Sequence, residues 1–154
     1  MQDVISEIMS SDLETVDITD TALEAAKKMS HKQISSVLVA DKHSRTEEPL
    51  GIITERDLVN RICAVGVSSK DVSVREVMSS PIATIERQAT VEAAADLMLS
   101  NKVRHLLVVD EQTRRPVGII APSDLNKYLR ANIDMDEVNA RILRAIESED
   151  MTEP

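Results

Sequence analysis

Aromatic side chains are nearly absent from this sequence, whose 154 residues include no Phe, no Trp and a single Tyr, Tyr128. A hydrophobic core must therefore be built from aliphatic residues and methionine, which are plentiful because 42% of the chain is hydrophobic. Proteins that bind single-stranded nucleic acid stack bases on aromatic side chains. The sequence offers no such platform, so this class of function is disfavoured.

Cysteine is equally scarce. Cys63 is the only thiol, so a disulfide within the chain is excluded, and we expect a reducing, cytoplasmic compartment. A lone cysteine more often fills a core than acts as a nucleophile, so we expect Cys63 to be buried. His31 and His43 have no metal-ligand spacing from Cys63 or from each other, and no metal site is predicted.

Long runs of one residue class are also missing. No apolar stretch approaches the ~18 residues of a membrane span, and the N-terminus lacks the basic-then-apolar pattern of a signal peptide. Acidic residues exceed basic ones by 27 to 18, a net charge of −9 that disfavours nucleic-acid binding. We therefore expect a soluble protein with one compact core and no membrane partner.

The sequence repeats itself. When Met9 is aligned with Met78, scattered identical residues recur along a span of about sixty positions. A loop that is two residues longer in the first copy then brings Gly51-Ile52-Ile53 onto Gly118-Ile119-Ile120. We therefore divide the chain into a first repeat (4–64), a linker (65–73) and a second repeat (74–131).

Each repeat has the pattern of a strand, a helix, two strands and a second helix. Thr21 and Thr90 are typical N-caps for the first helix, and short branched apolar runs predict buried strands that form a hairpin. A single repeat would expose one face of its sheet. We therefore predict an α/β (α+β) fold of two βαββα repeats packed about a pseudo-two-fold axis. The expected strands are 13–16, 37–39 and 50–53, then 82–85, 106–109 and 117–120, and the expected closing helices are 55–64 and 122–131.

The last strand of each repeat enters its closing helix through a similar string, Gly51-Ile-Ile-Thr-Glu-Arg-Asp57 in the first and Gly118-Ile-Ile-Ala-Pro-Ser-Asp124 in the second. A helix N-terminus presents free N–H groups to phosphate, and a carboxylate in its first turn can accept hydrogen bonds from two ribose hydroxyls. Thr54 with Asp57 is also a capping box, which is the simpler explanation of one copy alone. Ala121 cannot cap with its side chain, yet Asp124 keeps its place, and this favours ligand contact. The preference of the helix dipole for acids in the first turn is the alternative explanation of Asp124.

With these strings in both repeats, residues 4–131 resemble the cystathionine-beta-synthase (CBS) domain family. Paired CBS repeats bind adenosine-containing ligands, such as AMP, ADP, ATP or S-adenosylmethionine, in clefts between the repeats. The resemblance implies that Asp57 and Asp124 accept the ribose hydroxyls, and that the ligand binds with or without magnesium. It implies no catalytic cofactor.

The resemblance also implies the other members of each site. Thr54, Arg56 and Ser123 have donors for phosphate, and Ile52 and Ile119 would meet the base. The second repeat would add Ala83, Val103, Arg104 and His105 beside Asp57, and the first would add Glu14, Ile34 and Ser35 beside Asp124. Because the second copy lacks the Thr54 hydroxyl and the Arg56 charge, we expect a tighter site at Asp57 and a weaker or empty one at Asp124.

Residues 134–154 are predicted to form a C-terminal helix followed by an acidic tail that frays from Glu147. Met135, Val138, Ile142 and Ala145 recur at steps of three and four residues, which predicts an apolar stripe along this helix. The stripe either packs back on the pair or forms a subunit contact. The resemblance implies a homodimer formed through helices.

The sequence therefore favours a regulatory ligand-sensing module that signals through its shape or its affinity for an effector protein. We do not expect an enzyme, because no nucleophile, base and orienting group can be assembled around Asp57, His105 or Cys63. The alternative is a structural dimerisation scaffold with degenerate clefts. Ala121 favours that alternative, and Thr54, Arg56 and Asp57 oppose it.

Overall fold

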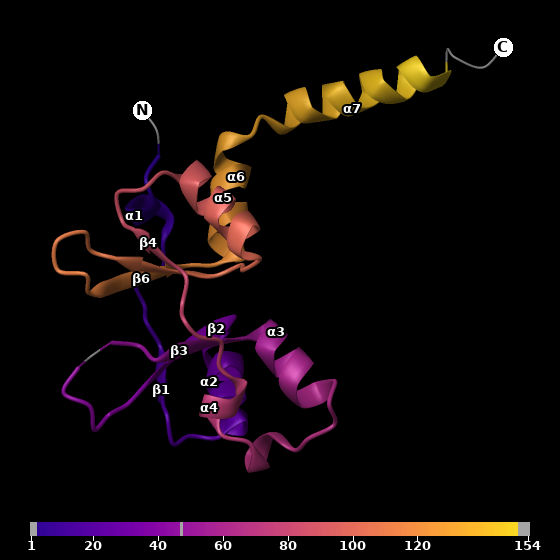
Figure 1. Ribbon diagram of the computed structural model, residues 1–154. Helices are drawn as coiled ribbons and strands as arrows, with labels where there is room; N and C mark the ends of the chain where they lie inside the picture. The colour runs from indigo at the N-terminus through magenta and orange to yellow at the C-terminus, as the bar shows by residue number, and fades with distance from the viewer. Residues whose placement is uncertain (1–2, 47, 151–154) are drawn as a thin grey trace.

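The computed structural model describes residues 3–46 and 48–150 and has two layers, each built on a three-stranded sheet (Figure 1). In the first, β1 (Thr15–Asp17) pairs in parallel with β2 (Ser36–Ala40), which pairs antiparallel with β3 (Gly51–Thr54). The second has the same topology. Its strands are β4 (Thr84–Glu86), β5 (Leu106–Val109) and β6 (Pro116–Ile120).

The helices complete the predicted order. In the first repeat, α2 (Ala22–Lys32) connects β1 to β2, and α3 (Glu55–Leu58) follows β3. In the second, α5 (Val91–Asn101) connects β4 to β5, and α6 (Pro122–Asn132) follows β6. The mixed α/β fold of two βαββα repeats is therefore confirmed.

Helix caps explain where α2 and α5 begin. The Thr21 N–H donates to Glu24 Oε2 at 2.7 Å, while the Glu24 N–H donates to Thr21 Oγ1 at 3.3 Å, which completes a capping box. Thr90 caps α5 by accepting a hydrogen bond from the Ala93 N–H at 3.1 Å. These caps satisfy N–H groups that have no partner within the helix.

The two repeats exchange their first short helices. Helix α1 (Ile5–Ile8) begins the first repeat but packs in the second, where the Ile5 N–H donates to the Ala89 carbonyl at 2.9 Å. Helix α4 (Val74–Val77) begins the second repeat but packs in the first, where the Val74 N–H donates to the Asp20 carbonyl at 2.9 Å. Figure 1 shows α1 beside the β4–β6 layer and α4 beside the β1–β3 layer. Each packing unit therefore contains residues from both sequence repeats.

The two sheets face each other across a small aliphatic core. It contains buried side chains from both repeats, including Leu38, Ile52 and Leu107, with Leu13, Ile82 and Ile119 packed at its edge. Each of these side chains lacks a polar atom, so burial stabilises the layer contact without leaving unsatisfied groups. This core holds the two halves together and leaves the ends of β3 and β6 beside the same space.

Several local predictions were wrong. Strands β1 and β4 begin two residues later than expected, and the first closing helix turns into the π-helical segment η1 (Val59–Cys63) after Leu58. Cys63 is exposed, so it does not fill the core. The linker contains a short 3-10 helix, η2 (Ser69–Asp71).

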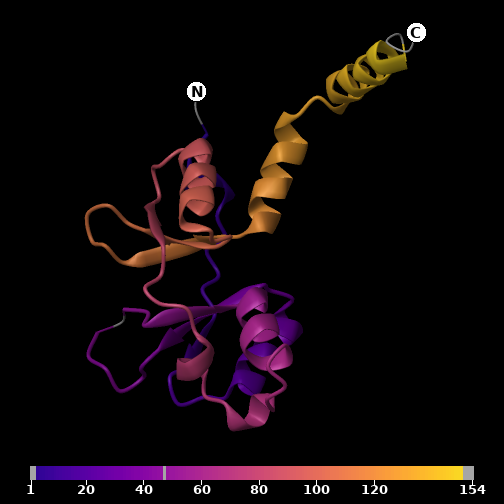
Figure 2. The ribbon, with the colours of Figure 1, turned by 45° about the vertical axis from the view of Figure 1, so that its right-hand side comes forward.

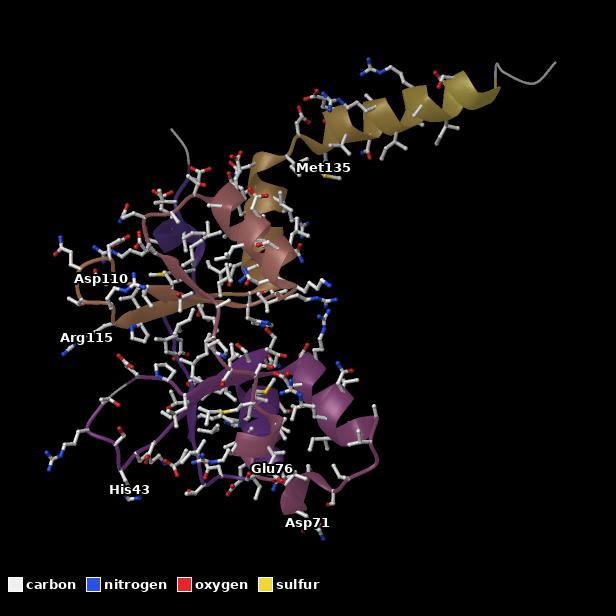
Figure 3. All side chains as sticks on the ribbon, viewed as in Figure 1. His43, Asp71, Glu76, Asp110, Arg115 and Met135 are labelled. Atoms are coloured by element: carbon white, nitrogen blue, oxygen red, sulfur yellow. The ribbon has the colours of Figure 1, made fainter. Side chains whose placement is uncertain are left out.

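Helix α7 (Met135–Asp150) extends away from the pair, as the turned view in Figure 2 shows. Met135, which Figure 3 shows at its start, is 53% exposed and Ile142 is 52% exposed, so the stripe does not pack back on the repeats. The helix also runs on past Glu147, where we expected fraying, and residues 151–154 of the predicted tail lie outside the described residues. Over the described ranges, none of the helices has the length and hydropathy needed to cross a bilayer.

Candidate functional site

A cleft of about 1260 Å³ lies between the two repeats, and both contribute to its lining. Every residue predicted to contact ligand lines this cleft, although the contacts themselves stay predictions. These residues are Glu14, Ile34, Ser35, Ile52, Thr54, Arg56, Asp57, Ala83, Val103, Arg104, His105, Ile119, Ser123 and Asp124. We call the part around Asp57 half-site 1 and the part around Asp124 half-site 2.

Asp57 lies in the first turn of α3 and is buried. Its Oδ2 accepts a hydrogen bond from the Thr54 N–H at 2.9 Å, and its own N–H donates to Thr54 Oγ1 at 3.3 Å. Its Oδ1 accepts from Ser79 Oγ at 2.8 Å and lies 3.6 Å from the Arg61 guanidinium. Both carboxylate oxygens of Asp57 are therefore engaged by the protein itself.

Asp124 occupies the equivalent place in α6 and is only half-buried. Its Oδ2 accepts a hydrogen bond from the Ala121 N–H at 2.8 Å. Within the part of the chain that the structure describes, its Oδ1 has neither a hydrogen-bond nor an ion-pair partner. Ser10, the counterpart of Ser79, makes no side-chain hydrogen bond to Asp124 among the hydrogen bonds of the described residues. Asp124 therefore presents a carboxylate oxygen with unused acceptor capacity to the cleft.

The exchanged segments explain why each half-site contains residues from both repeats. Ser79 and Ile52 exchange backbone hydrogen bonds at 2.8 and 3.0 Å, which places the start of the second repeat beside β3. Ser10 and Ile119 exchange them at 3.0 and 2.8 Å, which places the start of the first repeat beside β6. The strand that leads to each aspartate is thus bordered by the opposite repeat.

Glycine is needed where these segments cross. A Cβ at Gly51 would lie 3.0 Å from the Ser79 carbonyl oxygen, and one at Gly118 would lie 2.8 Å from the Ser10 carbonyl oxygen. Real Cβ atoms rarely come this close to backbone. The glycine in each string therefore leaves room for the backbone of the opposite repeat to pack against the strand.

His105 lies where the two half-sites meet. Its Nε2 is 2.8 Å from Ser35 Oγ, a hydrogen bond between the second repeat and the first. Burial lowers the pKa of His105 to about 4, with Asp57 opposing this shift and Arg104 adding to it. His105 is therefore a neutral imidazole at pH 7, so it meets a ligand as a hydrogen-bonding group and not as a cation.

The charges around the cleft are arranged unequally. Near half-site 2, the Glu14 carboxylate pairs with both Lys28 and Lys32 at 3.3 Å. The hydrogen bond from Lys32 is the largest cause of a lowered pKa at Glu14. Arg56 and Arg104 line the cleft, and neither forms an ion pair with any described residue. The guanidinium groups remain available to a phosphate.

Sequence reasoning missed several lining residues. Ser79, Lys102, Gln33 and Lys127 all line the cleft or contact Asp57 directly. Ser79 is identical to Ser10 when the repeats are superposed, so its place in the repeat was a signal that could have singled it out. Lys102 and Gln33 end α5 and α2 at equivalent left-handed caps, a feature visible only in the fold.

No group of three or more His, Cys, Asp or Glu side chains suited to a metal ion occurs among residues 3–46 and 48–150. His43 lies on the loop between β2 and β3, away from the cleft (Figure 3). The arrangement in the cleft therefore consists of carboxylates, helix N-termini, guanidinium groups and aliphatic walls. This set suits a ligand with hydroxyls, phosphates and a flat apolar ring.

Solved structures with this architecture are known. A conserved CBS domain protein of Thermoplasma acidophilum has a TM-score of 0.74 and 28% identity, with 84% of this chain and 70% of that chain covered. A hexameric CBS-CP12 protein from bloom-forming cyanobacteria also has a TM-score of 0.74 and 28% identity, covering 95% and 88%. A CBS domain protein of Pyrobaculum aerophilum complexed with AMP has a TM-score of 0.69 and 23% identity, covering 80% and 90%.

Sequence comparison gives the same family. An uncharacterised protein of Methanopyrus kandleri is 35% identical over 133 residues, which cover 84% of this chain and 66% of that protein. An inosine-5'-monophosphate dehydrogenase of Methanocaldococcus jannaschii is 31% identical over 121 residues, 79% of this chain but 22% of the enzyme. The CBS domain profile matches residues 5–64 and 74–131. The chain therefore belongs to the CBS domain family and carries two CBS domains in tandem.

Proposed function

We propose that this protein is a cytoplasmic, non-catalytic sensor that binds an adenosine-containing ligand between its CBS repeats and signals to an effector protein. Tandem CBS pairs are regulatory modules, and the relative from Pyrobaculum aerophilum is complexed with AMP. One observation carries the proposal. Asp57 and Asp124 each stand in the first turn of a helix, at the end of a strand, on the lining of one cleft.

The cleft offers a partner for each part of such a ligand. The carboxylates would accept ribose hydroxyls, and the helix N-termini and Arg56 would donate to phosphate. Ile52 and Ile119 would pack against the adenine ring. Ligand pockets usually measure about 300–1,000 Å³, so a cleft of about 1260 Å³ has room for one ligand in each half-site.

A thermal-shift screen of the full chain tests this proposal. AMP, ADP, ATP and S-adenosylmethionine are each added with and without magnesium. A ligand at a hundred times its dissociation constant stabilises a fold by ~2.7 kcal/mol, which raises Tm by roughly 5–10 °C for a chain of this length. The double variant Asp57→Ala/Asp124→Ala should lose the shift. If no ligand raises Tm, the scaffold alternative with degenerate clefts replaces the sensor.

We also propose that the protein forms a homodimer through its helices. Leu129 and Ile133 at the end of α6 are 47% and 40% exposed, and they continue toward the exposed apolar stripe of α7. Burying such side chains against a second copy would stabilise the assembly. Light scattering coupled to size-exclusion chromatography should give twice the 17.0 kDa chain mass. A mass of one chain at micromolar concentration would contradict the dimer.

A further inference from the structure

The two half-sites differ in charge at positions that the repeat makes equivalent. Arg56 in half-site 1 corresponds to Ser123 in half-site 2. At the C-terminal ends of α5 and α2, Lys102 corresponds to Gln33 in the same way. Just beyond these caps, Arg104 corresponds to Ser35. Half-site 1 therefore has three cations where half-site 2 has three neutral polar side chains.

Apart from Arg61, which pairs with Asp57, the cations of half-site 1 form no ion pair with any described residue, whereas Lys28 and Lys32 near half-site 2 are paired with Glu14. Among the described residues, Arg56, Lys102 and Arg104 form no ion pair. Half-site 2 has Glu14 where half-site 1 has Ala83, and Lys28 and Lys32 are both bound to that carboxylate. Lys127 on α6 lines the cleft on the side of half-site 2. It forms no ion pair with any described residue. Phosphate groups therefore find free cationic partners mainly in half-site 1.

The two carboxylates differ in the opposite sense. Ser79 and Thr54 already donate to the oxygens of Asp57, so a ribose hydroxyl must compete with them there. Asp124 accepts only the Ala121 N–H within the described chain and keeps one oxygen free. A ribose therefore finds its better acceptor in half-site 2, because a buried acceptor that is already satisfied gains little from another donor.

We infer that the two half-sites bind different ligands. Half-site 1 takes an adenine nucleotide with two or three phosphates, and half-site 2 takes an adenosyl compound without phosphate. This inference rests on the proposed adenosyl-sensing function and divides it between the two halves. Arginine forms short, charge-assisted hydrogen bonds with phosphate in a fixed geometry, so Arg104 and Arg56 select for phosphate in half-site 1. Ser35 and Ser123 have no charge with which to do so.

Titration calorimetry on the full chain tests this division. ATP and adenosine are each titrated alone, and ATP is then titrated into protein saturated with adenosine, with S-adenosylmethionine as a second phosphate-free probe. We expect one ATP and one phosphate-free ligand per chain, with no competition between them. Raising the salt concentration should weaken ATP binding and leave adenosine binding within twofold.

Reciprocal variants at one pair of equivalent positions locate each ligand. Arg104→Ser should weaken ATP binding at least tenfold and leave adenosine within twofold. Ser35→Arg should raise the number of bound ATP molecules from one to two. Arg115→Ser is the matched control, because Arg115 is exposed on the loop between β5 and β6, outside the cleft (Figure 3), and it should change neither affinity.

Different failures have different meanings. If ATP and adenosine displace each other from one site, or if Arg104→Ser weakens both equally, the division between half-sites is wrong while adenosyl binding stands. If neither ligand binds the unmodified chain, the division is wrong, and the proposed function is wrong as well if AMP, ADP and S-adenosylmethionine also fail to raise Tm in the thermal-shift screen. If circular dichroism shows that Ser35→Arg fails to fold, Ser35→Lys supplies the same charge test, and an unchanged ATP stoichiometry in that variant overturns the division.

Discussion

Replacing Ile5 by alanine tests whether the two repeats truly exchange their first helices. Ile5 belongs to the first repeat, yet it is fully buried in a cluster with Ile85, Leu106 and Ile120 of the second. Large-to-small changes at fully buried aliphatic positions lower the free energy of unfolding by roughly 2–5 kcal/mol. Small domains have a total stability of about 5–15 kcal/mol. The variant should therefore lose a large fraction of its stability, measured as a lower urea midpoint by circular dichroism.

A sharper test is which strands lose protection from hydrogen exchange in the Ile5→Ala variant. Hydrogen exchange measured by mass spectrometry under native conditions reports local openings segment by segment. Ile5→Ala should lower protection in β4, β5 and β6 more than in β1, β2 and β3, although Ile5 is closer in sequence to the latter. The matched control is Val74→Ala in α4, which should do the reverse because Val74 packs in the first repeat. If Ile5→Ala exposes the first repeat, or lowers stability by less than about 1 kcal/mol, the exchange is refuted.

Two further perturbations probe the crossing and the cleft. Gly118→Ala places a Cβ 2.8 Å from the Ser10 carbonyl oxygen, so it should lower stability by roughly 1–3 kcal/mol in urea unfolding, and an unchanged midpoint would contradict the crossing. Because burial lowers the pKa of His105 from 6.5 to about 4, only the unfolded state takes up a proton as pH falls through this window. Stability should therefore decrease between these pH values by up to roughly 3 kcal/mol, and His105→Asn should flatten that part of the profile. An equally steep profile in the variant would exclude His105 as its cause.

The order of strands and helices could be predicted because local signals agree in both copies. Thr21 and Thr90 are N-caps in sequence and in structure, and the apolar runs became β2, β3, β5 and β6. The exchange of α1 and α4 could not be predicted in this way. Nothing local distinguishes an Ile5 that packs on its own repeat from one that packs on the other, since both environments are aliphatic. That choice is made by the global arrangement.

The lining of the cleft could be predicted for a different reason. The resemblance to CBS domains supplied residues of the opposite repeat, such as Ala83 and Glu14, that no local pattern would join to Asp57 or Asp124. The resemblance did not predict the hydrogen bond from Ser79 to Asp57. The repeat does not predict this bond either, since Ser10 at the equivalent place makes no such bond to Asp124 among the described residues. Side-chain pairing within a site depends on packing details that two nearly identical sequence segments do not reveal.

Affinity at the two half-sites therefore has no ranking that holds for every ligand. On sequence alone, Thr54 and Arg56 favour Asp57 as the tighter site, because the motif is complete there. In the fold, the same Thr54 and Ser79 both donate hydrogen bonds to the Asp57 carboxylate, so we expect a ribose to contribute less at half-site 1 than at half-site 2. We expect phosphate groups to reverse this order, because Arg56 and Arg104 line the cleft and form no ion pair with any residue that the structure describes. A ligand bound mainly through ribose and one bound mainly through phosphate should thus prefer opposite halves of the cleft.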